Sequence, residues 1–119
     1  MYEYRFEKLR VYQHAVTLVE DIYILTKELP NEERFALINQ LKRSSTSIVL
    51  NIAEGSGGLG DKEYKSFLRI ALKSTYETIA CLKLAERLFK VNVSQTLEIC
   101  NMVGKELHSL IKSLDRDKK

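Results

Sequence analysis

The chain has 119 residues, of which 45% are hydrophobic and 29% charged, and its formal net charge is +3. This length and composition are typical of one domain with a single core, so we expect residues 1–119 to form one domain. There are only five glycines and one proline, which is too few for a turn-rich β fold. Because no apolar run approaches 18 residues and no signal peptide is recognisable, we expect a cytoplasmic protein without membrane contact.

The first predicted helix covers about residues 7–29. Apolar residues recur every three or four positions from Leu9 onward, as they do on the buried face of a helix. Pro30 disfavours helical geometry in the residue before it, so this helix should end near Leu29. The side chain of Asn31 is suited to cap the helix that follows.

The same periodicity predicts three further helices, at about residues 32–54, 61–90 and 95–114. A glycine-rich turn at 55–60 separates the first two of them, and Asp61 is suited to cap the helix after the turn. Residues 115–119 form a charged tail that we expect to fray. Short connections make consecutive helices antiparallel, so the sequence predicts an all-α, up-down-up-down antiparallel four-helix bundle.

Three glycines of the turn match a pattern that binds dinucleotides in other folds. Gly55, Gly57 and Gly60 have the spacing G-x-G-x-x-G, but that site requires a strand before the first glycine, and here a helix precedes it. Asp61 stands where a phosphate-binding loop would need lysine. We therefore interpret the segment as a turn between two helices.

The remaining candidates for chemistry do not form a catalytic or metal site. His14 and His108 lie on different predicted helices without a ligand at helical spacing, and Cys81 and Cys100 have no metal-ligand spacing. We expect both cysteines to be thiols. The sequence thus predicts a non-enzymatic protein with no catalytic residue, metal, cofactor or small-molecule substrate.

Polar residues form a stripe along the segment 32–54. Their spacing of three and four positions brings them within about 80° of one another on a helix; they are Gln40, Ser44, Ser47, Asn51 and Glu54. One interpretation is hydrogen bonding to Ser74, Tyr76 and Glu77 of the segment 61–90, alongside in an antiparallel hairpin. The other is a surface for self-association.

Basic residues share one face of the segment 61–90. They project within about 100° of one another and comprise Lys62, Lys65, Arg69, Lys73, Lys83, Arg87 and Lys90. Such a row, about 40 Å long, could follow a phosphate backbone, with Tyr76 in the same arc as a stacking platform for a base. The alternative is an ordinary solvated helix face, since lysine commonly covers the outside of a bundle.

Five short segments of the sequence match the signature of a known protein family. They are Phe6-Glu7-Lys8-Leu9, Leu29-Pro30, Gln40-Leu41-Lys42-Arg43-Ser44, Asn51-Ile52-Ala53-Glu54-Gly55 and Phe67-Leu68. Over about residues 6–114 the chain resembles the bacterial four-helix bundle proteins called 23S rRNA intervening sequence proteins. It departs from their usual pattern at Tyr12 (usually Trp), Lys73 (usually Gly) and Thr78 (usually Leu).

This resemblance implies a homo-oligomer, in the form of a ring-shaped homopentamer, and a role related to RNA. A pentamer would carry five times the charge of the chain, +15 in total. Distant relatives are accessory proteins of diversity-generating retroelements, which bind RNA and a reverse transcriptase. Our first hypothesis is therefore RNA binding, alone or with an RNA-processing protein, through the basic row. The alternative is a structural scaffold that binds only proteins.

Overall fold

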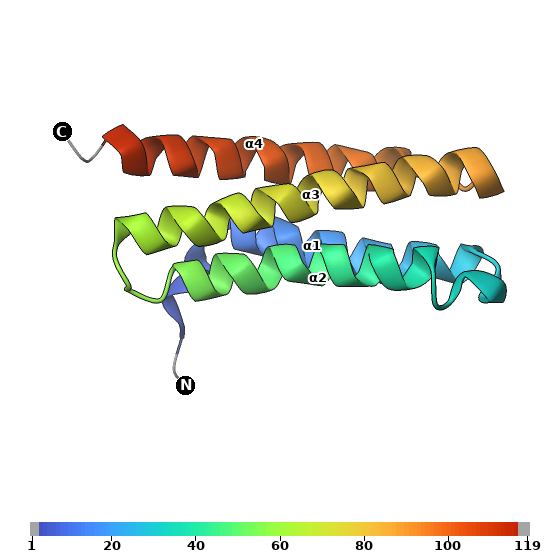
Figure 1. Cartoon of the computed structure of the whole chain (residues 1–119), viewed down its shortest axis with the longest axis horizontal. Coiled ribbons are helices and arrows are strands. Elements are labelled where there is room, and N and C mark those ends of the chain that lie inside the picture. Colours follow the sequence, from blue (N-terminus) through green and yellow to red (C-terminus); the bar gives the residue numbers. More distant parts are fainter. Residues whose placement is uncertain (1–2, 117–119) are drawn as a thin grey trace.

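The computed structural model describes residues 3–116, which form four long helices joined by short connections (Figure 1). The long helices are α1 (Arg10–Leu25), α2 (Leu37–Gly55), α3 (Asp61–Phe89) and α4 (Ser94–Arg116). Three short 3-10 helices, η1 (Arg5–Lys8), η2 (Thr26–Glu28) and η3 (Asn31–Glu33), lie at the two ends of α1 and before α2. Because no strand occurs between residues 3 and 116, the predicted all-α class is confirmed.

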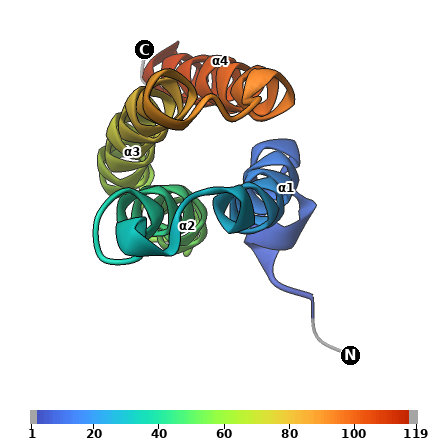
Figure 2. The ribbon, with the colours of Figure 1, turned by 90° about the vertical axis from the view of Figure 1, so that its right-hand side faces the viewer.

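Consecutive helices run in opposite directions, so α1 begins and α4 ends at the same end of the bundle (Figure 1). In the end view the four helices surround one core, each beside its neighbour in the chain, and α4 returns toward α1 (Figure 2). The α2–α3 hairpin has the most extensive interface, and the α1–α4 interface is the smallest of the four. The predicted up-down-up-down antiparallel arrangement is confirmed.

The first helix is shorter than its predicted range of 7–29. At its start, Leu9 has extended backbone (φ −73°, ψ 128°) and separates α1 from the 3-10 turn η1. At its end, the last turn tightens into η2, and Leu29 before Pro30 is extended, with ψ 151°. Leu29 before Pro30 is thus non-helical, as Pro30 predicts. The turns that flank α1 are 3-10 helices, which are common at helix ends.

The second helix begins at Leu37 and not at residue 32, and Asn31 does not cap it. Arg34, Phe35 and Ala36 are all exposed. Helices in proteins gain most of their stability from packing of an apolar face. Because none of these three side chains packs into the core, the helix does not extend over them. Instead of Asn31, the Glu33 carboxylate accepts a hydrogen bond from the Leu37 N–H at 3.4 Å.

The third and fourth helices lie close to their predicted ranges. Asp61 is the first residue of α3 and not its cap, because Gly60, with φ 102°, takes the N-cap position. The acidic group remains favourable there because it faces the positive end of the helix dipole. α4 starts one residue early, at Ser94, and continues through Asp115, which is bound to Lys65 of α3. The predicted frayed tail is thus helical at 115–116, and its remainder lies outside the described residues.

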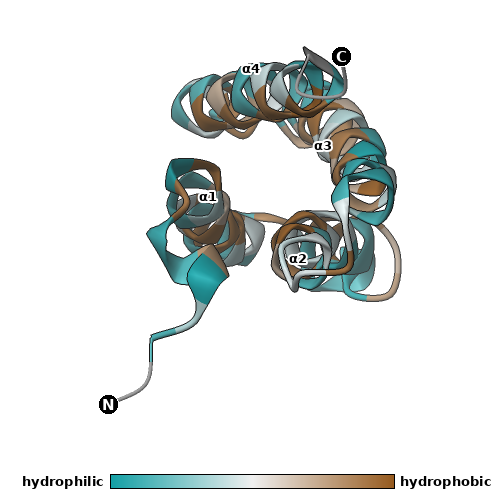
Figure 3. Ribbon diagram, turned by 90° about the vertical axis from the view of Figure 1, so that its left-hand side faces the viewer, coloured by the Kyte–Doolittle hydropathy of each residue, from teal (hydrophilic) through white to brown (hydrophobic). Residues whose placement is uncertain are grey.

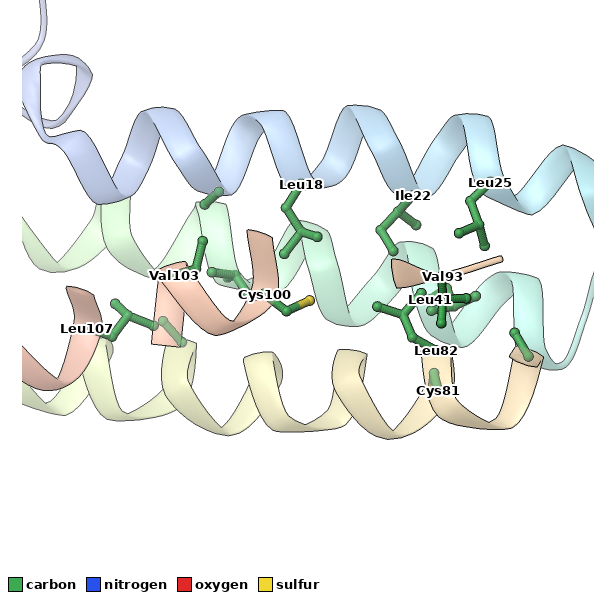
Figure 4. Packing of buried hydrophobic residues seen from close by; sticks show 14 of the residues in the cluster. Leu18, Ile22, Leu25, Leu41, Cys81, Leu82, Val93, Cys100, Val103 and Leu107 are labelled. Atoms are coloured by element: carbon green, nitrogen blue, oxygen red, sulfur yellow. The ribbon is translucent and has the colours of Figure 1, made fainter. Parts of the chain in front are cut away.

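The core is one continuous cluster of apolar side chains from all four helices (Figure 4). Fully buried members include Leu18 and Ile22 from α1, Leu41 from α2, Leu82 from α3 and Leu107 from α4. Burial of one such side chain contributes about 1.5–3 kcal/mol to stability. Cys81 and Cys100 are unpaired thiols within this cluster.

In the ribbon coloured by hydropathy, hydrophobic residues lie mainly toward the interior of the bundle and hydrophilic residues mainly on its outside (Figure 3). This amphipathic pattern is the one that predicted the helices from the sequence. Between residues 3 and 116, none of the helices is long and apolar enough to pass through a bilayer.

Candidate nucleic-acid interface

The outer side of α3 carries a row of exposed basic side chains. Leu68, Ala71, Leu82 and Ala85 are fully buried on one side of this helix, so the opposite side faces solvent. Six basic residues there are exposed, and we term them the basic face: Lys62, Arg69, Lys73, Lys83, Arg87 and Lys90. The row extends over about 42 Å at about 1.5 Å per residue.

Lys65 does not belong to this face, although its position in the sequence predicts it. Its residue is only 9% exposed, and its Nζ lies 2.5 Å from Asp115 Oδ1 at the end of α4. The ammonium group therefore joins α3 to α4 and is not available to a ligand. The helical projection is right about the direction of this side chain, but α4 covers that part of α3.

No carboxylate of the described residues lies within ion-pair distance of the basic face. The three ion pairs in this part of the chain are Lys8–Glu3, His14–Glu106 and Lys65–Asp115. Glu77 and Glu86 are on α3 but form no ion pair with the neighbouring cations. The six charges are therefore uncompensated at short range, which favours attraction of an anionic partner.

Tyr76 stands in the middle of the basic face and turns toward α4. It is 56% exposed, and its hydroxyl is 3.2 Å from His108 Nε2. This hydrogen bond restrains the Tyr76 ring, which remains accessible to solvent. A restrained, accessible ring is suited to stack on a nucleic-acid base.

α4 adds basic residues that the sequence analysis missed. Lys105 and Tyr76 line one groove between α3 and α4. Lys112 is exposed on α4, between His108 and Asp115, which both contact α3. A helical projection of α3 alone could not identify these two lysines. Their position beside α3 depends on how α4 packs against it. The positive surface therefore spans two helices.

The polar stripe of α2 forms hydrogen bonds to α3 along part of its length. Ser74 Oγ donates to Ser47 Oγ at 3.0 Å, and Asn51 Nδ2 donates to the same oxygen at 3.1 Å. Thr78 Oγ1 donates to Ser44 Oγ at 2.7 Å. These groups are buried or half-buried, so their hydrogen bonds offset the cost of removing them from water.

The other residues of the stripe lie outside this hydrogen-bonded row. Gln40 and Glu54 of α2 and Glu77 of α3 are exposed. Tyr76 was expected alongside α2, but its hydrogen bond to His108 places it on the α4 side of α3. Thr78, which the sequence analysis named only as a departure from the family pattern, forms a hydrogen bond to α2 of the kind expected of Tyr76.

The glycine-rich segment has a packing role at its first residue. Gly55 is the last residue of α2 and is buried. A Cβ atom there would lie 2.9 Å from Phe67 Cβ and 3.0 Å from Tyr64 Cδ1. The absence of a side chain thus allows α2 and α3 to approach closely where the hairpin turns, and a helix, not a strand, precedes the loop.

The histidines and cysteines hold structural positions. His14 Nδ1 of α1 is 2.8 Å from Glu106 Oε1 of α4, so this half-buried pair joins the first helix to the last. Burial raises the pKa of the Cys100 thiol to about 12 and, together with the charge of Glu77, raises the pKa of Cys81. A raised pKa disfavours the nucleophilic thiolate. Among residues 3–116 no group of three His, Cys, Asp or Glu side chains could hold a metal ion.

Comparison with known proteins identifies the family. The sequence profile of the 23S rRNA-intervening sequence proteins matches residues 7–113, which includes nearly all of the four helices. The chain belongs to the 23S rRNA-intervening sequence protein family. The expected resemblance is confirmed. No protein of curated function matches the chain significantly.

A solved structure supports the same family assignment. It is a protein of unknown function from the S23 ribosomal protein family of Bacteroides thetaiotaomicron, 32% identical in sequence. The match covers 86% of this chain and 98% of the other, with a TM-score of 0.75. The helical bundle is therefore shared by the two proteins.

The structure shows where two departures of the chain from the family's usual pattern lie. Thr78, where Leu is usual, forms the buried hydrogen bond to Ser44. Lys73, where Gly is usual, is exposed on the basic face and does not interfere with a close helix contact. One departure thus adds an interhelical hydrogen bond, and the other adds a cation to the basic face.

Proposed function

We propose that this protein is non-enzymatic, associates with itself and binds RNA through the basic face of α3. The observation that carries the proposal is the row of six exposed cations on one rigid helix, none with a carboxylate partner within 4 Å among the described residues. Arg and Lys side chains that neutralise phosphates supply the sequence-independent part of nucleic-acid affinity. Such contacts position RNA without reading its sequence.

The names of the family and of the solved relative support RNA as the partner class. The family is named for an intervening sequence of 23S rRNA, and the solved relative is assigned to a ribosomal protein family. A net charge of +3 is small for a nucleic-acid-binding chain. The positive charge that would bind RNA is therefore local to α3 and the adjoining part of α4.

Self-association is the second part of the proposal, with a homopentamer as the expected form. Several large apolar side chains are exposed, among them Ile24 (63%), Phe35 (82%), Leu50 (60%) and Leu88 (61%). Contiguous exposed apolar surface marks protein interfaces, and we propose that these side chains are covered by neighbouring copies in the assembly. Light scattering should give a mass near five times 13.8 kDa, about 69 kDa, and a monomer mass would contradict this part.

Charge reversal on α3 tests the RNA-binding part. We expect Arg69→Glu, Lys73→Glu and Arg87→Glu together to abolish binding of a labelled RNA, measured by fluorescence anisotropy at about 50 mM salt, where phosphate contacts are strong. The matched control reverses Lys27, Arg34 and Arg43, which are exposed and lie outside α3. Both variants change the net charge from +3 to −3. Equal loss in the two variants would show that only overall charge matters.

The same measurement distinguishes a protein-binding scaffold. Phosphate contacts weaken steeply as salt rises, whereas a mainly apolar protein interface depends little on salt. An oligomer that takes up RNA at about 50 mM salt and releases it at about 300 mM supports the proposal. An oligomer that ignores RNA at both concentrations would overturn it in favour of the scaffold.

A further inference from the structure

A groove between α3 and α4 opens beside Tyr76, in the middle of the basic face. Its volume is about 240 Å³, and Thr75, Tyr76, Asn101, Gly104, Lys105 and His108 are among the residues that line it. Sites for drug-sized ligands typically measure about 300–1,000 Å³. This groove is therefore too small for a large cofactor and suits one flat ring.

Gly104 of α4 lines the groove and contributes no side chain to it. A Cβ atom on Gly104 would lie 3.9 Å from Thr75 Cγ2 and meet nothing else within 4 Å. A larger side chain at residue 104 would extend into this space. Tyr76 forms one wall of the groove, and its hydrogen bond to His108 holds that wall in place.

The lining has the chemistry to bind a nucleobase and its phosphate. The Tyr76 ring offers an aromatic surface, and base stacking on such rings does not depend on base identity. Asn101 is exposed, and its amide, which makes no hydrogen bond within the described part of the chain, can donate to or accept from a base edge. Lys105 supplies a cation at the rim.

The groove also occupies the one wide gap in the basic face. Lys73 and Lys83 are ten residues apart, which is about 15 Å along the helix, and the exposed cations on either side of them are more closely spaced. A strand that follows the row must cross this gap beside Tyr76. There a phosphate would meet Lys105 of α4 instead of a cation of α3.

We infer that this groove is a pocket for one unpaired base, so the protein prefers single-stranded RNA to duplex RNA. In an A-form duplex the bases are stacked and paired and cannot enter such a pocket, whereas bases of a single strand can turn out and stack on aromatic side chains. This inference rests on the proposed RNA binding and names the class of RNA that the same site takes.

The test compares two RNAs and three proteins. The RNAs are a 12-nucleotide single strand with 2-aminopurine at its centre and the same strand annealed to its complement. The proteins are the full-length chain, Tyr76→Ala and the control Tyr76→Phe, which keeps the ring. We expect Tyr76→Ala to weaken single-strand binding roughly 5- to 150-fold and duplex binding by less than about twofold. Tyr76→Phe keeps the stacking ring and loses only the hydrogen bond to His108, so it should retain most of the affinity for the single strand and the quenching of 2-aminopurine.

The outcomes separate this inference from the proposed function. Equal loss of single-strand and duplex affinity in Tyr76→Ala, or 2-aminopurine fluorescence that the wild-type protein does not quench, would overturn the pocket and leave RNA binding in place. Failure of the wild-type protein to bind either RNA at low salt would overturn the proposed function itself. Circular dichroism of Tyr76→Ala should match wild type, since the residue is largely exposed.

Discussion

Thr78 of α3 donates a 2.7 Å hydrogen bond to Ser44 of α2, with both side chains buried between the two helices. The same Thr78 hydroxyl lies 2.8 Å from the carbonyl oxygen of Ser74, one turn earlier. Together with the Ser74–Ser47 contact, this bond gives the α2–α3 hairpin a row of polar contacts beside its apolar core. The row favours this register of the hairpin, because a slip by one residue would break the hydrogen bonds between the hydroxyls of the two helices.

The Thr78–Ser44 bond should contribute measurably to stability. We expect Thr78→Val and Ser44→Ala each to lower the free energy of unfolding by about 1 kcal/mol. In a double-mutant cycle measured by urea denaturation, the two changes should couple by about 0.5–1.5 kcal/mol. Effects that add within about 0.3 kcal/mol would mean that the two hydroxyls do not depend on each other.

Two glycines should respond to alanine in opposite directions. Gly55→Ala places a Cβ 2.9 Å from Phe67 Cβ, and overpacking of this kind typically costs about 1–3 kcal/mol. Gly104→Ala finds ordinary contact distances, and the better helix propensity of alanine should stabilise the protein by about 0.5–1 kcal/mol. Thermal unfolding of the two variants gives the comparison. Destabilisation by both, to a similar extent, would contradict the difference in packing.

Lys65 should matter little to RNA, in contrast to its neighbours in the sequence. We expect Lys65→Met to leave RNA affinity within about twofold of wild type, whereas Lys73→Met should weaken it about two- to fivefold, as for loss of one exposed ionic contact. The reason is that Lys65 is bound to Asp115, while Lys73 is exposed. Isothermal titration of both variants with one RNA decides the point, and a larger loss in Lys65→Met would place its ammonium group at the interface.

Alkaline pH should destabilise the protein in part through Cys100. Burial raises the pKa of this thiol to about 12, against an ordinary value of about 8.5. Its stabilising contribution is complete below about pH 8.5 and is lost as pH rises toward about 12, because the native state holds the proton more tightly than the unfolded state. Between pH 8.5 and 10 we expect wild type to lose about 1.5 kcal/mol more than Cys100→Ala. Identical losses in urea denaturation would argue against an ionisation penalty at this residue.

Most of the fold could be predicted because each long helix keeps one apolar face over its length. The predicted range of α3 differs from the observed one by a single residue, since Gly60 starts the helix and Lys90, with φ 57°, ends it. The start of α2 could not be predicted from Asn31. Capping chemistry favours a helix there, but Arg34, Phe35 and Ala36 have no core to pack against, and that depends on the positions of other helices.

The candidate site could be predicted only where it lies on one helix. Periodicity places the six residues of the basic face correctly on an exposed side of α3. It could not show that Asp115, fifty residues further along the chain, binds Lys65. The contact of His108 with Tyr76, the position of Lys105 and the groove beside Tyr76 could not be predicted either, because they depend on how α4 packs against α3.

The dependence of RNA affinity on salt is the most direct test of binding through the basic face. For a single strand, the slope of log K against log salt concentration is about −0.7 per phosphate contact. Neutralising Arg69, Lys73 and Arg87 to glutamine should therefore reduce the size of the slope by about 2, while the same change at Lys27, Arg34 and Arg43 leaves it unaltered. A slope that stays the same in the α3 variant would show that the phosphates of the RNA lie elsewhere on the protein.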